Sequence, residues 1–89
     1  MQLKRISSDA AAELTDSILV SIYAEDSDNR SAAVMWMAEG NVISDEGPLI
    51  VPEALDLAKT LAEEQARDIV YVVCEPEDAW KLEWGDLVE

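Results

Sequence analysis

The chain has 89 residues, with 20 acidic residues against 6 basic ones and a formal net charge of −14 at pH 7. This charge excludes direct binding to nucleic acids or to anionic membranes, because both need clustered Lys and Arg. Apolar residues make up 49% of the chain, which is typical of a folded protein rather than a disordered one. We therefore expect one acidic domain over residues 1–89, with a core of modest size.

Missing residue types narrow the function further. The chain has no His, which excludes histidine general-base catalysis, Ser-His and Cys-His nucleophile pairs and most zinc sites. Residues 26–29 resemble the opening of a calcium loop, but Met37 stands at the twelfth position, where a bidentate Glu is required. We expect no enzymatic activity, no metal and no cofactor, although clustered carboxylates leave a weak metal-dependent activity open.

Location follows from segments that the sequence lacks. No apolar stretch typical of a secretory signal follows the basic residues at 4–5. The longest apolar runs are far shorter than the ~20 residues that a membrane-spanning helix needs. A single cysteine, Cys74, fits a reducing compartment. These features predict a soluble, cytoplasmic protein.

The first third of the chain predicts a short helix and a strand. Residues 1–6 suit either a short strand or a flexible lead, and the oxygens of residues 7–9 can cap a helix that ends near Asp16. Residues 17–25 are rich in β-branched residues, and Ile18, Val20 and Ile22 alternate with polar neighbours, which favours a strand. The spacing of Ala11, Leu14, Ile18 and Ile22 also fits one longer helix that reaches residue 24.

Two further strands follow a polar loop at 26–31. The strand predicted at 32–38 places Val34 and Trp36 on one face and Met35 and Met37 on the other. A turn at 39–41 predicts a hairpin with a short strand at 42–44. Residues 45–48 contain Gly and Pro and interrupt the strand pattern.

The clearest unit is a helix at 52–67 followed by a strand at 69–74. Pro52 suits the first turn of a helix, and apolar residues recur on one face (Ala54, Leu55, Ala58, Leu61, Ala62 and Ala66). The strand is apolar on both faces, which is typical of a central strand covered on both sides or of a dimer seam. The whole pattern predicts an α+β fold: a small two-layer sandwich with an antiparallel-rich sheet, helices on one face, and the approximate order α-β-β-β-α-β.

The last fifteen residues combine acids with two tryptophans. Trp80, Trp84 and Leu87 fit one face of a short helix, whereas residues 80–84 also alternate like an edge strand that Gly85 would end. Exposed tryptophans among carboxylates would make a binding surface, because Trp anchors many interfaces and acids steer basic partners. The alternative is that one or both tryptophans cap the core.

Other acids are predicted on the exposed side of the central helix (Glu53, Asp56, Glu63 and Glu64) and in loops (Glu25, Asp26, Asp28, Asp45 and Glu46). Lys59 and Arg67 have the spacing to pair with Glu63 along that helix.

Our leading hypothesis is a small inhibitor whose carboxylates mimic nucleic-acid phosphates and block a basic nucleic-acid-binding protein, such as a nuclease or a CRISPR effector subunit. In composition, though not in any motif, the chain resembles the short acidic proteins that phages make against restriction or CRISPR systems. That resemblance implies an anti-restriction or anti-CRISPR viral protein in the bacterial host cytoplasm. The predicted partner-binding residues are Glu75, Glu77, Asp78, Trp80, Glu83, Trp84 and Asp86.

The alternative hypothesis is a non-enzymatic structural or regulatory interaction module, with a homodimer as one form. The seam would be formed by Val70, Val72 and Cys74, or by Met35 and Met37. In that case the acidity serves solubility alone.

Overall fold

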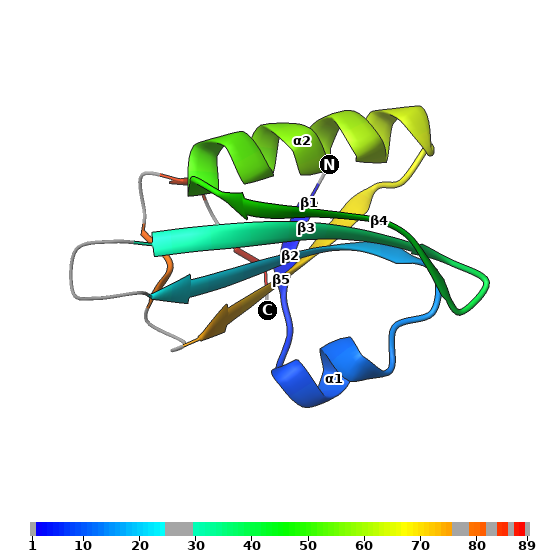
Figure 1. Ribbon diagram of the computed structural model, residues 1–89, viewed down its shortest axis with the longest axis horizontal. Helices are drawn as coiled ribbons and strands as arrows, with labels where there is room; N and C mark the ends of the chain where they lie inside the picture. Colours follow the sequence, from blue (N-terminus) through cyan, green and yellow to red (C-terminus); the bar gives the residue numbers. More distant parts are fainter. Residues whose placement is uncertain (1, 25–29, 76–78, 82–83, 86, 89) are drawn as a thin grey trace.

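A computed structural model describes residues 2–24, 30–75, 79–81, 84–85 and 87–88. The described chain forms a five-stranded mixed sheet and two helices, which confirms the α+β expectation (Figure 1). In chain order the elements are β1 (Gln2–Arg5), α1 (Ser8–Ala12), β2 (Ser17–Ala24), β3 (Arg30–Ala38), β4 (Asn41–Leu49), α2 (Val51–Glu64) and β5 (Ile69–Glu75).

The sheet has the strand order β1-β5-β2-β3-β4. The last strand, β5, inserts in parallel between β1 and β2, whereas β2, β3 and β4 form an antiparallel meander. The order therefore differs from the predicted one by a leading strand, and the sheet is mixed rather than antiparallel-rich. Residues 2–5 form a strand rather than a flexible lead, because they pair with β5.

The helices lie on opposite faces of the sheet, not on one face as predicted. Figure 1 shows α2 lying along one face and α1 beneath the other. Because β5 is central, both of its faces are covered, as its continuous apolar pattern indicated. Val72 packs in the core on the α2 side, and Val73 packs on the α1 side.

The main core lies between α2 and the sheet. Ala54, Ala58 and Ala62 are fully buried on one stripe of α2, and their small side chains let the helix approach the strands closely. Leu55 and Leu61 are only partly buried at the sides of this stripe. The alternating residues Ile18, Val20 and Ile22 of β2 and Val34 of β3 meet the helix from the sheet.

A second, smaller cluster lies on the α1 side. Leu19, Met37 and Val73 form its buried centre, and Ala11 and Leu14 pack against it from α1 and the chain that follows. The side-chain oxygen of Ser7 accepts a hydrogen bond from the N–H of Ala10 at 3.1 Å and caps α1, as expected. Residues 17–24 form a strand, so the longer helix is not observed.

The hairpin between β3 and β4 confirms the predicted turn. Glu39 and Gly40 both have positive φ angles, 54° and 79°, as type I′ hairpin turns require. Strand β4 continues to Leu49, however, through the segment predicted to interrupt it. It can do so because β4 is an edge strand, where the missing N–H of Pro48 is tolerated and register shifts accommodate the irregular residues.

Helix α2 begins one residue before the predicted start and ends at Glu64, three residues before the predicted end. Pro52 lies in its first turn, as expected. At the end, Ala66 has a φ of 54°; its N–H donates to the carbonyl of Glu63, and the N–H of Arg67 donates to that of Ala62. These bonds form a Schellman motif, which stops the helix.

Val88, the last described residue, pairs with the edge strand β1. The N–H of Arg5 donates to the carbonyl of Val88 at 2.8 Å, and the N–H of Val88 donates to the carbonyl of Leu3 at the same distance. Val88 thus pairs with the side of β1 that does not face β5. Neither helix in the described chain is long and apolar enough to cross a membrane.

Candidate partner-binding surface

The described carboxylates all lie on the surface of the protein. Every described Asp and Glu is exposed, and no charged residue is buried in the described chain. Within that part of the chain, Asp16 is the one carboxylate that forms an ion pair, and its partner is Arg67. The negative charge of the remaining described carboxylates is therefore available to a partner molecule.

Three basic side chains make contacts within the protein. The Nε–H of Arg30 donates to the carbonyl of Ala79 at 3.3 Å, and Lys81 Nζ lies 5.8 Å from the ring centroid of Trp84. The helical spacing predicted that Arg67 pairs with Glu63, but Arg67 pairs with Asp16 instead. The reason is that Arg67 lies beyond the end of α2, where the chain has already left the helical path.

The outer face of α2 carries a row of acids that we call the α2 row: Glu53, Asp56, Glu63 and Glu64. All four are exposed, as predicted. The α2 row extends from Glu53 to Glu64, about 16 Å along the helix axis at roughly 1.5 Å per residue. Glu53 lies in the first turn, where a negative charge is favourable. Glu63 and Glu64 lie at the carboxyl end, where the helix dipole makes a negative charge unfavourable.

Trp80 and Trp84 are half-buried and pack against the main core on the α2 side. Their rings meet edge to face, with centroids 5.3 Å apart and planes at 78°. Among the described residues around them, Ala79 and Trp84 have 3₁₀-helical conformation, and Trp80, Lys81 and Gly85 lie in neither a helix nor a strand. The N–H of Trp84 donates to the carbonyl of Lys81 at 3.0 Å, which closes a tight turn. The tryptophans therefore cap the core and keep part of their surface exposed.

Trp84 also lines a shallow hollow with Pro52, Leu55 and Asp56, which we call the Trp84 hollow. Its volume is about 430 Å³. Pro52 and Leu55 supply apolar contact surface from the first turns of α2, and Asp56 supplies a carboxylate of the α2 row. The Asp56 carboxylate makes no ion pair with the described residues. The hollow thus combines an aromatic ring, an apolar wall and one available negative charge.

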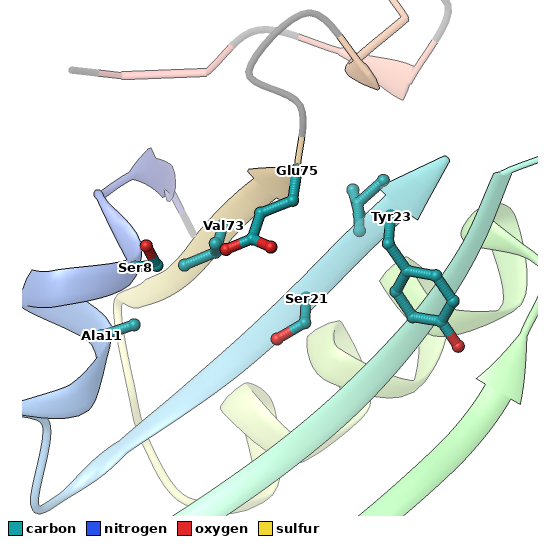
Figure 2. A pocket seen from close by; sticks show the side chains of 7 residues that line it. Ser8, Ala11, Ser21, Tyr23, Val73 and Glu75 are labelled. Atoms are coloured by element: carbon teal, nitrogen blue, oxygen red, sulfur yellow. The ribbon is translucent and has the colours of Figure 1, made fainter. Parts of the chain in front are cut away.

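Glu75 lies elsewhere. It lines a groove of about 210 Å³ on the α1 side of the sheet, with Ser8, Ala11, Ser21, Ile22, Tyr23 and Val73. Figure 2 shows Glu75 reaching over this groove from the end of β5, with Ser8 and Ala11 on one side and Ser21 on the other. The structure therefore separates Glu75 from the tryptophans, because successive residues of β5 point to opposite faces of the sheet.

The remaining predicted binding residues, Glu77, Asp78, Glu83 and Asp86, lie outside the described residues, as do the loop acids Glu25, Asp26 and Asp28. Asp45 and Glu46, also predicted in a loop, lie in β4 and are exposed.

Sequence patterns missed the three residues of α2 that meet Trp84. Pro52, Leu55 and Asp56 are about thirty positions away in the chain, and no local spacing indicates that contact. The approach of Lys81 to Trp84 does have a local signal, since a separation of three residues brings side chains together in one turn.

The structure also bears on the predicted dimer seams. Val70, Val72 and Cys74 face α2 and are buried within the chain, so they cannot form a seam between copies. Met37 is buried on the α1 side, and Met35 is partly buried beside it. Of the two predicted dimer seams, only the one at Met35 and Met37 remains, and Met35 alone keeps part of its surface exposed there.

Comparisons with protein-family models, with curated proteins and with solved structures gave no match.

Proposed function

We propose that this protein is a non-enzymatic inhibitor whose carboxylates take the place of nucleic-acid phosphates on a basic nucleic-acid-binding protein. The observation that carries the proposal is that every described carboxylate is exposed, and that among them Asp16 alone forms an ion pair with a described residue. A groove that binds DNA or RNA gains affinity by neutralising closely spaced negative charges. The α2 row offers such charges on a rigid helix.

Solubility alone explains the charge less well. A small domain remains soluble with a net charge of about 2–8 in magnitude, whereas this chain carries −14. Glu63 and Glu64 also lie at the end of α2 where acids destabilise a helix. Charge retained at a cost in stability is typical of a functional surface.

We further propose that the target is a nuclease or a CRISPR effector subunit, and that the protein acts in the cytoplasm of a bacterium against which a phage deploys it. This identification rests on the acidic composition and on the class of groove that carboxylates can fill.

Affinity capture tests the proposal. The protein is immobilised, exposed to bacterial lysate, and eluted with rising salt in the presence or absence of duplex DNA or of RNA. We expect a basic nucleic-acid-binding protein that elutes at moderate salt and is displaced by one of the nucleic acids. Capture that is insensitive to both nucleic acids, or a dimer with no captured protein, would contradict the proposal.

A further inference from the structure

One basic side chain of the protein already shows what the ring of Trp84 attracts. The Nζ atom of Lys81 lies 5.8 Å from the centroid of this ring, within the range of a cation–π interaction. Trp84 simultaneously lines the Trp84 hollow. The ring of Trp84 therefore borders the hollow and also has one cation of the chain beside it.

We propose that the Trp84 hollow receives an arginine side chain of the partner, and that Lys81 competes with this arginine for the ring. The inference rests on the proposed function only in assuming that the partner is a basic protein. It identifies the Trp84 hollow as the place where one side chain of the partner binds. The overall acidity of the protein does not identify such a place.

Arginine fits the lining better than lysine does. Its planar guanidinium stacks on aromatic rings and is weakly hydrated, so it leaves water more easily than an ammonium group. Asp56 lines the hollow with a carboxylate that makes no ion pair with the described residues, and a guanidinium can bond to such a group through two N–H donors. Pro52 and Leu55 offer apolar surface to the methylene groups of the arginine stem.

The charges around the hollow also favour a cation. Glu53 precedes Asp56 by one turn of α2, and both are exposed. The basic residues nearby are Lys81, at the ring, and Lys59, one turn beyond Asp56 on the same helix. An arriving arginine therefore meets one competing cation at the ring itself. Removing the charge of Lys81 should therefore strengthen the binding of arginine. Removing the charge of a distant lysine should strengthen it by a smaller factor.

The experiment uses the ¹⁵N-labelled full chain and two probes, an oligoarginine and an oligolysine peptide of equal length. Binding is followed by the indole N–H resonances of the three tryptophans, assigned with Trp84→Leu and Trp80→Phe. The variants are Lys81→Met, Asp56→Asn and, as the charge-matched control, Lys4→Met. Lys4 pairs with Tyr71 on the β1–β5 ladder and thus projects to the opposite face of the sheet from the hollow.

We expect oligoarginine to shift the Trp84 resonance and to bind more tightly than oligolysine. Lys81→Met should tighten oligoarginine binding by about two- to fivefold, the equivalent of a cation–π contact at an exposed site. Lys4→Met should have a smaller effect, and Asp56→Asn should weaken binding.

Three results would overturn the proposal: an unshifted Trp84 resonance, equal binding of the two peptides, or equal effects of Lys81→Met and Lys4→Met. Each of these would leave the proposed function intact if affinity capture still returned a nucleic-acid-binding protein. Conversely, failed capture with a specific arginine response would remove the proposed target and keep the site.

Discussion

The indole N–H of Trp80 donates a hydrogen bond to the carbonyl oxygen of Gly85 at 3.0 Å. This bond spans the turn that carries Trp84, so it holds the two rings in their edge-to-face contact over the core. Gly85 has a φ of 108°, a conformation that residues with a side chain rarely adopt. The position of the aromatic pair thus depends on one glycine.

Replacing that glycine should loosen the aromatic pair. In Gly85→Ala, a Cβ would meet open space but the backbone would be strained, so we expect a loss of about 1–2 kcal/mol in the free energy of unfolding. Urea unfolding measures this loss, and near-UV circular dichroism should show weaker tryptophan signals. Unchanged stability together with an unchanged spectrum would mean that the Trp80–Gly85 contact does not hold the cap.

The end of α2 allows a stabilising substitution. Ala66 has a φ of 54° at the position of the Schellman motif where glycine is preferred. We expect Ala66→Gly to raise the free energy of unfolding by about 0.5–1 kcal/mol, because the strain exceeds the entropy gained by the unfolded chain. The matched control is Ala58→Gly, in the buried middle of the same helix, which should lower it by about 1 kcal/mol or more. A loss of stability in both variants would contradict the assigned helix end.

Cys74 should make stability dependent on pH in the alkaline range. Burial raises the pKa of its thiol above the ordinary value of 9.0, and the nearby Arg5 guanidinium opposes this rise only in part. Well below pH 9 the thiol is neutral in both the folded and the unfolded state. Above it, the unfolded chain loses the proton first, so the free energy of unfolding falls as the pH rises.

The Cys74→Ala variant isolates this effect, since all other titrating groups are shared. We expect the difference in free energy of unfolding between wild type and variant to be nearly constant at pH 7 to 8 and to shrink as the pH rises through 9. Urea unfolding at closely spaced pH values provides the measurement. A difference that stays constant through pH 11 would show that the thiol ionises equally in both states.

The parts of the fold that sequence predicted are those with a strong local period. The alternation in β2 and β3, the turn at Glu39 and Gly40, and the change of period between α2 and β5 each depend on neighbouring residues, so the sequence indicates them directly. The continuation of β4 through Pro48 depends instead on its place at the edge of the sheet. The opposite placement of α1 and α2 likewise depends on which strands pair.

For the candidate site, the sequence predicted which kinds of residue are present better than it predicted where they lie relative to one another. Acids around Trp80 and Trp84 indicated a basic partner from composition, and Asp56 was expected on an exposed helix face. The sequence could not place Glu75 on the opposite face from the tryptophans, because that depends on the orientation of β5 relative to the chain that follows it. It also could not bring Asp56 to Trp84 across some thirty residues.

The claim that carboxylates replace phosphates is tested most directly by the salt dependence of binding to the captured protein. Dissociation constants are measured over a range of salt concentrations for the wild type, for Glu53→Lys with Asp56→Lys, and for Asp9→Lys with Glu13→Lys. The last pair is the charge-matched control, since both residues are exposed acids in or next to α1, across the sheet from α2.

We expect wild-type binding to weaken steeply with salt, and the α2 pair to lose more than tenfold in affinity at low salt and to show a shallower salt dependence. The α1 pair should change affinity by a smaller factor. Wild-type binding that holds or tightens as salt rises would contradict phosphate mimicry and indicate an apolar interface, in which the acids serve solubility.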